Sequence, residues 1–322
     1  AIILFSWYII IVLVHIIQLR RENMIEIKNL SKSFNGKDYV LENLNCKIGD
    51  NAIYGLVGAN GAGKSTLLRI INSIYTADEG TVLIDNENAY DNESLKQEMV
   101  FVPDDLYFYS GYTLMDMAEY YKSLYHNFDM KYVINTANTL KLNSNAKISS
   151  FSKGMKRQCA LICALATNAK YLFFDETFDG LDPVVRKYFK KLLSDAMLKN
   201  NTTIIMTSHN LRELEDICDN LGLLYKGNIL FESDIDSLKT NMFKVQISLK
   251  DDFNKDTFKK LKILSYKKIG SVATLIIDEE GRDSKKYLES LKPIILDYLP
   301  LTLEEVFIYQ MEALGYEFES LV

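Results

Sequence analysis

The chain has 322 residues, of which 48% are hydrophobic and 25% charged, and its 37 basic and 43 acidic side chains give a net charge of −6. This composition is typical of a globular protein with a sizeable core, and it excludes a disordered, collagen-like or multi-span membrane chain. The mildly acidic balance gives no electrostatic reason to bind nucleic acid. We therefore expect about two globular domains and no nucleic-acid partner.

The first segment departs from this average. Residues 1–19 contain no Asp, Glu, Lys or Arg, and Arg20 and Arg21 follow them. A helix of this length would cover about 28 Å, enough to span a bilayer, and the two arginines would hold the following domain on the cytoplasmic side. Alternatively, residues 1–23 result from the choice of start site or remain from something upstream, because the stretch after Met24 resembles the start of a complete domain. A signal peptide fits less well, since the charges follow the apolar run.

After Met24, short apolar runs alternate with helical stretches, which indicates an α/β domain with a largely parallel sheet. Residues 92–168 contain few strand-like runs and predict an inserted helical lobe. Several of the strand-like runs are apolar throughout, as strands covered on both faces must be. We predict strands at Ile25–Asn29, Val40–Ile48, Ala52–Val57, Thr81–Ile84, Met99–Val102, Tyr171–Phe174, Thr203–Met206, Leu221–Tyr225 and Ile229–Glu232.

The pattern changes near the C-terminus, after a short connector at residues 234–239. Strand-like and helix-like runs follow one another in the order β-α-β-β-α-β, which predicts a small split βαβ domain of the α+β class. We therefore predict domains at residues 24–238 and 239–322. The predicted elements are a strand at 245–249, a helix at Lys255–Leu261, strands at Leu264–Lys268 and Ala273–Ile277, a helix at Ser284–Leu291, a strand at Ile294–Asp297 and a final helix at Leu303–Leu314.

A glycine-rich loop follows the apolar strand AIYGLV. Residues 58–65 read GANGAGKS, which matches G-x-x-x-x-G-K-[ST] between a strand and a helix. Glycines let the backbone fold around phosphate oxygens, and the helix N-terminus adds positive potential. Lys64 is expected to reach the β- and γ-phosphates, and the Ser65 hydroxyl to bind Mg²⁺. The nucleotide-binding residues that this loop predicts are Gly58, Ala59, Asn60, Gly61, Ala62, Gly63, Lys64, Ser65 and Thr66.

Two later strands also end in residues that suit this chemistry. The run YLFFDE ends in Asp175 and Glu176, and the run TTIIMTSH ends in His209. A carboxylate at the end of a buried strand can hold Mg²⁺, so we assign this role to Asp175. Glu176 then suits the general base that activates water, and His209 can contact the γ-phosphate and orient that water.

Between these strands, residues 150–158 read SFSKGMKRQ and open an apolar helix. Hydroxyl, backbone N–H groups and helix dipole make such a helix start an anion site. With this motif, the chain resembles the ATP-binding-cassette (ABC) family over residues 24–235, because Ser152 and Gly154 match its LSGGQ signature. The resemblance implies a P-loop NTPase fold with a helical signature subdomain, ATP and Mg²⁺ as cofactors, and ATP hydrolysis. It also implies that a signature segment contacts the ATP of a partner cassette: here Ser152, Lys153, Gly154 and Met155.

The resemblance extends to two further positions. Residues 179–183 read DGLDP and match the D-loop of the family, which implies that Asp182 lies at the contact between two cassettes. Phe34 falls where the family stacks an aromatic ring on adenine, and Tyr39 is the alternative. Since the chain carries one set of motifs, the resemblance implies that it pairs with a second ABC ATPase subunit, a copy of itself or a paralogue.

Several residues depart from the family pattern. The family has Gln in the V-P-Q loop that leads into the helical lobe, whereas this chain has Asp104, which can still bind Mg²⁺ or a water molecule but lacks the amide donor. Lys153 and Met155 replace the Gly and Gln of the signature, and Thr177 stands where Pro is frequent. These variations resemble cassettes of antibiotic-peptide and multidrug exporters, which implies a location at the cytoplasmic face of the membrane and a separate multi-span permease.

Two other functions compete with the exporter. A soluble ABC ATPase acting on ribosomes or DNA is the first alternative, although the chain has neither two cassettes, nor long coiled coils, nor a basic patch. A nucleotide-gated regulatory module is the second, and Glu176 argues against it because a sensor needs no general base. The aromatic residues of 106–112 suit a permease contact, but packing inside the helical lobe is an equally good interpretation.

Overall fold

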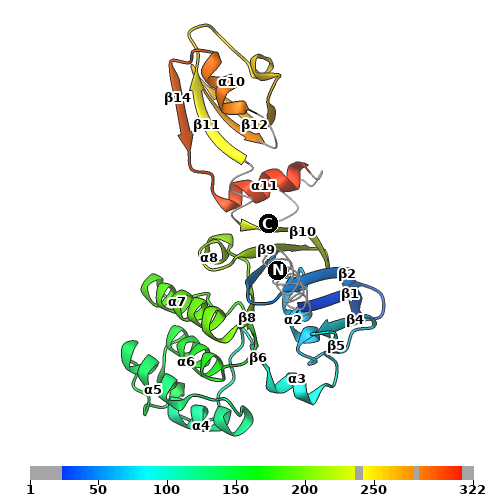
Figure 1. The fold of residues 1–322 in the computed structure, drawn as a ribbon, viewed down its shortest axis with the longest axis vertical. Coiled ribbons are helices and arrows are strands. Elements are labelled where there is room, and N and C mark those ends of the chain that lie inside the picture. The colour runs from blue at the N-terminus through cyan, green and yellow to red at the C-terminus, as the bar shows by residue number, and fades with distance from the viewer. Residues whose placement is uncertain (1–23, 236–241, 279–282, 314–322) are drawn as a thin grey trace, which may run out of the picture. The chain divides into compact units, whose positions relative to one another are not determined.

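The computed structural model describes residues 24–235, 242–278 and 283–313. The chain divides into two compact units, Ala1–Glu232 and Ser233–Val322 (Figure 1). The predicted domain boundary at residue 238 stays a prediction, because residues 236–241 lie outside the described part of the chain. The same holds for the apolar residues 1–23. Among the described residues, no helix is long and apolar enough to cross a membrane.

An antiparallel sheet begins the first unit. It has the order β2-β1-β4-β5 and is built from Met24–Ser33 (β1), Tyr39–Gly49 (β2), Glu79–Ile84 (β4) and Glu87–Asn88 (β5). Ile25 lies opposite Ile48 of β2 and Ile84 of β4, and all three side chains are buried. The prediction of a single, largely parallel sheet missed this antiparallel sheet, because apolar runs do not reveal which strands pair.

A second sheet, mainly parallel, carries the strands that end in the predicted site residues. Its order is β10-β9-β3-β8-β7-β6, and β9-β3-β8-β7-β6 pair with one another in parallel. The residues of the central strands β3, β7 and β8 are buried throughout, as their apolar sequences require. The strands are Ile53–Val57 (β3), Met99–Val102 (β6), Tyr171–Asp175 (β7), Thr203–Ser208 (β8), Asn220–Tyr225 (β9) and Asn228–Asp234 (β10). All strands predicted for this domain are confirmed.

The register of the parallel sheet brings its functional ends together. Val57 pairs with Ser208, and Asp175 pairs with Thr207, so the carboxyl ends of β3, β7 and β8 lie at one edge. Open α/β sheets bind ligands at such an edge. The helices that begin after these strand ends are Lys64–Ile71 (α2), Pro183–Asn200 (α7) and Leu211–Glu215 (α8).

The predicted helical lobe is confirmed. Figure 1 shows α4, α5 and α6 packed together, away from the antiparallel sheet. Thr113 caps α4 in a reciprocal capping box with Asp116, and Asp129 caps α5, so the local sequence fixes both helix starts. The elements of this region are Glu93–Gln97 (α3), Leu114–Leu124 (α4), Met130–Thr139 (α5), the 3₁₀ turn Ile148–Ser150 (η1) and Lys153–Ala166 (α6).

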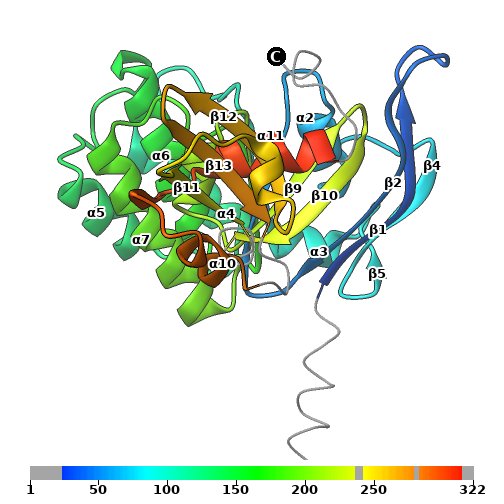
Figure 2. The same cartoon turned by 90° about the horizontal axis from the view of Figure 1, so that it is seen from above.

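The second unit is a four-stranded antiparallel sheet of order β12-β13-β11-β14, and Figure 2 shows it from above. This order confirms the split βαβ prediction. The predicted helix Lys255–Leu261 is wrong in kind, because only a 3₁₀ turn forms there, fixed by a capping box between Asn254 and Thr257. The elements are Met242–Ser248 (β11), Lys255–Phe258 (η2), Lys262–Ile269 (β12), Val272–Asp278 (β13), Ser284–Ser290 (α10), Ile295–Leu299 (β14) and Leu303–Ala313 (α11).

Candidate nucleotide-binding site

The glycine-rich loop connects β3 to α2 and wraps around the side chain of Lys64. The Lys64 ammonium group donates hydrogen bonds to the carbonyl oxygens of Gly58, at 2.7 Å, and Ala59, at 3.2 Å, and only 4% of the side chain is exposed. Gly63 caps α2 with a φ of 107°, and a Cβ atom there would lie 2.9 Å from the Val40 carbonyl oxygen. The loop therefore needs glycine at this position for both conformation and space.

Ser65 and Asp175 meet beside the loop. The Ser65 hydroxyl donates a 2.9 Å hydrogen bond to Asp175 Oδ1, and the Thr207 hydroxyl donates to the same oxygen at 2.8 Å. Asp175 is 1% exposed, so two hydroxyls orient a buried carboxylate. A hydroxyl and a carboxylate oxygen are the hard donors that Mg²⁺ prefers, and this pair therefore fits the metal expected with a nucleotide.

Glu176 follows Asp175 in a strained backbone conformation. Its φ is 47°, in the left-handed region that residues other than glycine seldom adopt. The backbone N–H of Glu176 donates to the carbonyl oxygen and the hydroxyl of Thr207, and these contacts hold the conformation. One carboxylate oxygen lies 3.3 Å from Lys64 Nζ, and the other lies 3.3 Å from His209 Nδ1. The strain thus aims the carboxylate between the loop lysine and the histidine.

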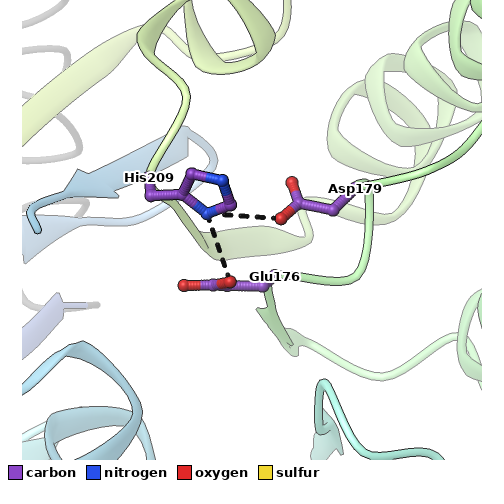
Figure 3. Close-up of side chains that lie close together, drawn as sticks. All are labelled: Glu176, Asp179 and His209. Carbon is purple, nitrogen blue, oxygen red and sulfur yellow. Dashed lines mark hydrogen bonds and ion pairs between the residues drawn. The ribbon is translucent and has the colours of Figure 1, made fainter. Parts of the chain in front are cut away.

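His209 joins Glu176 to Asp179. Figure 3 shows the imidazole between the two carboxylates, with Nδ1 also 3.4 Å from Asp179 Oδ2. The nitrogen and oxygen ligand atoms of the three residues all lie within 4.8 Å of one another. Asp179 was expected only as the first residue of the D-loop motif, with no role at this site. Its position three residues after Glu176 was the available signal.

A buried carboxyl group lies behind this cluster. Glu213 on α8 accepts a hydrogen bond from the Ser208 hydroxyl, at 3.3 Å, and pairs with Arg186 of α7 at 2.9 Å. Burial and the neighbouring carboxyl of Asp179 raise the pKa of Glu213 to about 7, and the Arg186 guanidinium opposes this shift without cancelling it. Glu213 was not predicted, because nothing in the local sequence shows that this side chain is buried beside another acid.

A pocket of about 560 Å³ opens above the glycine-rich loop. It brings together Phe34 from the end of β1, the loop itself, and the acids at Asp104 and Glu176. Phe34 is 59% exposed and makes an edge-to-face contact with Tyr75 at 5.5 Å. Tyr39, the alternative aromatic residue, is not among the residues that line the pocket. The lining consists of Phe34, Val40, Asn60, Gly61, Gly63, Lys64, Ser65, Thr66, Asp104 and Glu176.

The signature residues and Asp182 do not line this pocket. Ser152 caps α6 by accepting a 3.3 Å hydrogen bond from the Met155 N–H, and Ser152 and Lys153 are exposed. Gly154 lies close to the D-loop, since a Cβ atom on it would be 3.3 Å from the Gly180 carbonyl oxygen. Asp182 caps α7 by accepting hydrogen bonds from the N–H groups of residues 184 and 185. Their contact with a partner cassette stays a prediction.

Asp104 lies in the pocket wall with a partner that the sequence analysis missed. Its Oδ1 accepts a 2.6 Å hydrogen bond from Arg157 Nη2, and the Asp104 side chain is 51% exposed while that of Arg157 is 3% exposed. The expected role of Asp104 in binding Mg²⁺ or water stays a prediction. In this structure the carboxylate is already engaged by an arginine from α6.

The fold and the site define a P-loop nucleotide-binding protein, and comparison with known proteins assigns the family. The protein-family model described as "ABC transporter" matches residues 41–179 of the chain. The ABC transporter ATP-binding protein YtrB of Bacillus subtilis is 32% identical over 285 residues, which cover 88% of this chain and 97% of that protein. The chain therefore belongs to the ABC transporter ATP-binding family.

Further relatives differ in what their names say they transport. The methionine import ATP-binding protein MetN of Clostridium acetobutylicum is 32% identical, covering 68% of this chain and 71% of its own. The bacitracin transport ATP-binding protein BcrA of Enterococcus faecalis is 29% identical, covering 67% and 71%. In three dimensions, a solved ATP-binding subunit of an ABC transporter matches 68% of this chain and 92% of its own, with a TM-score of 0.61 and 24% identity. This last likeness concerns the fold alone.

Proposed function

We propose that this chain binds and hydrolyses ATP as the subunit that drives a separate multi-span membrane permease, in the direction of export. One observation carries the ATPase assignment. Lys64, Ser65 and Glu176 line one pocket, where Lys64 Nζ lies 3.3 Å from a Glu176 carboxylate oxygen, and the buried Asp175 accepts a 2.9 Å hydrogen bond from Ser65 beside it. A cation, a pair of Mg²⁺ donors and a candidate base at one pocket are what phosphoryl transfer to water requires.

Each residue then has a definite task. Lys64 neutralises phosphate oxygens while the Gly58–Thr66 backbone surrounds them, and Phe34 provides a ring for the adenine. Ser65 and Asp175 would hold Mg²⁺, which supplies charge neutralisation on the phosphates when bound. Glu176 accepts a proton from the attacking water, and His209, 3.3 Å away, orients that carboxylate.

The chain acts as one half of a pair of cassettes. The signature segment Ser152–Met155 starts α6 outside the pocket lined by Phe34 and Lys64. A second subunit would therefore bring its own signature to this pocket, and Asp182 would lie at the contact. ATP bound between two subunits favours the closed pair, and hydrolysis removes that preference, so the nucleotide supplies the free-energy difference between the two states.

An exposed aromatic surface supports a permease as the partner of this chain. Tyr107 is 76%, Tyr109 40% and Tyr120 38% exposed, and their rings also contact one another or Tyr112 at 5.0 to 5.6 Å. Tyrosine is enriched at protein interfaces because it combines apolar area with a polar tip. We place the permease on this surface, and the chain accordingly at the cytoplasmic face of the membrane.

The relatives named for bacitracin and lantibiotic transport support export, together with the departures from the family pattern at Asp104, Lys153 and Met155.

The test is to purify the tagged chain from its native membrane in mild detergent and identify what accompanies it. Recovery of a multi-span membrane protein supports the proposal, and recovery with ribosomes or DNA alone overturns the proposed permease partner. Inside-out vesicles that contain the purified complex should accumulate labelled bacitracin when ATP is added. ATP-driven uptake of methionine into right-side-out vesicles, with ATP enclosed, would show import and overturn the proposed direction of export.

A further inference from the structure

The Asp104–Arg157 ion pair connects two parts of the first unit that the nucleotide site uses separately. Asp104 lies two residues after the end of β6 and lines the pocket together with Lys64 and Ser65. Arg157 lies in the second turn of α6, the helix whose first residues carry the signature. The 2.6 Å hydrogen bond between them therefore spans from the pocket wall to the signature helix.

The burial of Arg157 makes this contact important for the guanidinium. Its side chain is 3% exposed, and among the described residues its Nε atom has no hydrogen-bond partner. A buried cation is costly unless it is paired, and removing the partner leaves the cost uncompensated. Since Asp104 supplies the carboxylate, the position of α6 depends on where the loop after β6 places Asp104.

The guanidinium also lies close to the D-loop. A Cβ atom built on Gly180 would be 3.4 Å from Arg157 Nη1, and one built on Gly154 would be 3.3 Å from the Gly180 carbonyl oxygen. Arg157 is thus packed where the signature helix, the D-loop and the loop after β6 meet. These three segments all carry predicted site residues, and each lies close to the Arg157 side chain.

We infer that Arg157 is a positioning residue, which fixes the signature helix α6 to the pocket wall through Asp104. This inference rests on the proposed ATPase function and adds to it a residue that touches neither nucleotide nor metal. The half-exposed Asp104 carboxylate faces the pocket, and its bond to Arg157 transmits the position of that wall to Ser152–Met155. Loss of the pair leaves the contacts of Lys64 and Ser65 intact, but it releases the helix that must reach the ATP of a partner subunit.

The pair makes a distinctive prediction for kinetics. Arg157→Gln should lower kcat by about tenfold, since small misplacements of remote groups cost this much or more. The Kd for ATP should stay within about twofold, because the P-loop side of the pocket is untouched. Asp104→Asn should have a similar effect. Arg157→Lys keeps the charge without the planar fork, and it should recover part of the loss.

A double-mutant cycle separates positioning from simple packing. If the two residues act through their bond, the variant with both Asp104→Asn and Arg157→Gln loses no more kcat than the worse single variant. If each side chain acts independently, the losses multiply, and this result would overturn the inference. The double variant also removes the buried charge, so the test remains available if Asp104→Asn alone fails to fold.

Lys156→Gln provides a matched control, because it removes a positive charge from the adjacent position of the same helix. This variant should keep kcat and Kd within about twofold of wild type. ATP binding by calorimetry and turnover by phosphate release are measured for the wild-type chain in the same series. Wild-type protein that fails to bind or hydrolyse ATP overturns the proposed function itself. An active wild type with Arg157→Gln indistinguishable from Lys156→Gln overturns only the role of Arg157.

Discussion

The Ser65 hydroxyl donates a 2.9 Å hydrogen bond to Oδ1 of Asp175, a residue 110 positions further along the chain. Thr207, at the end of β8, donates to the same oxygen at 2.8 Å. The pairing of β7 with β8 places Asp175 opposite Thr207, and α2 begins one residue before Ser65. Three distant segments thus converge on one buried carboxylate, and the nucleotide site is built around this point.

Lys64→Ala should abolish measurable ATP binding. The ammonium group is the buried cation at the glycine-rich loop, and each hydrogen bond to a charged group contributes about 1.5 to 3 kcal/mol, so the loss is about a hundredfold or more in Kd. Calorimetric titration with ATP and Mg²⁺ measures it. The control is Lys199→Ala, an exposed lysine on α7. An unchanged affinity in the Lys64 variant would contradict the assignment of the loop.

Glu176→Gln should stop turnover while ATP still binds. The amide keeps the shape of the side chain but cannot accept the proton, and loss of a general base costs about a hundredfold to ten-thousandfold in kcat. Hydrolysis is followed by phosphate release, and the trapped ATP-bound dimer by light scattering after gel filtration. Glu119→Gln, at an exposed position on α4, is the control. Wild-type turnover in the Glu176 variant would exclude this residue as the base.

Phe34→Ala should weaken ATP binding by about tenfold, because stacking of a base on an aromatic ring contributes about 1 to 3 kcal/mol. Tyr39→Ala removes an exposed aromatic residue at the start of β2 that is not among the pocket-lining residues, and it should change the affinity by less than about twofold. Titration of both variants with a fluorescent ATP analogue gives the comparison. The opposite ranking would move the adenine site to Tyr39.

Gly80→Ala should destabilise the first unit by about 2 to 3 kcal/mol. Gly80 has a φ of 81°, and a Cβ atom there would lie 2.3 Å from the Asn29 carbonyl oxygen of β1. Gly49, at the end of β2, has open space around its Cα, so Gly49→Ala should change the stability by no more than about 0.5 kcal/mol. Urea unfolding followed by circular dichroism measures both. Equal midpoints for the two variants would show that β1 and β4 can separate at this point.

Glu213→Gln should change how stability depends on pH. Burial and the neighbouring Asp179 raise the pKa of Glu213 to about 7 from an ordinary value of 4.5, so the folded state holds a proton that the unfolded state releases. The stabilisation from this group is complete below the unfolded pKa and is lost as the pH rises through about 7. Glutamine stays neutral, and the variant should therefore gain stability relative to wild type as the pH rises. Urea unfolding from about pH 5 to about pH 8 gives the two curves, and parallel curves would contradict the shift.

Much of the nucleotide site was predictable because its residues stand beside strong local patterns. Lys64 and Ser65 follow a motif whose glycines are needed for conformation, and Asp175, Glu176 and His209 end apolar runs that form buried strands. The rule that parallel strands share an edge then brings the strand ends together. The strands of the C-terminal unit were predictable for the same reason, since their turns and apolar runs are local features.

Other features depend on contacts between distant segments. No local pattern indicates that β1, β2, β4 and β5 form their own antiparallel sheet, and pairing of this kind is decided by which apolar faces are buried together. The expected helix at Lys255–Leu261 is only a 3₁₀ turn, although the capping box at Asn254 favours a helix start, so the local sequence did not reveal the difference. The partners of Asp104 and Asp179 could not be predicted from the sequence for the same reason.

By itself, the sequence determined the glycine-rich loop and the residues that we propose as metal ligands and base, because those chemistries require particular residue types at short, fixed spacings. Only the tertiary structure decided that Arg157 pairs with Asp104, that His209 lies between Glu176 and Asp179, and that Glu213 is buried beside an acid. The physical reason is range. Backbone conformation and capping are set by a few neighbouring residues, whereas the charge and burial of a side chain are set by segments that meet only when the sheet has formed.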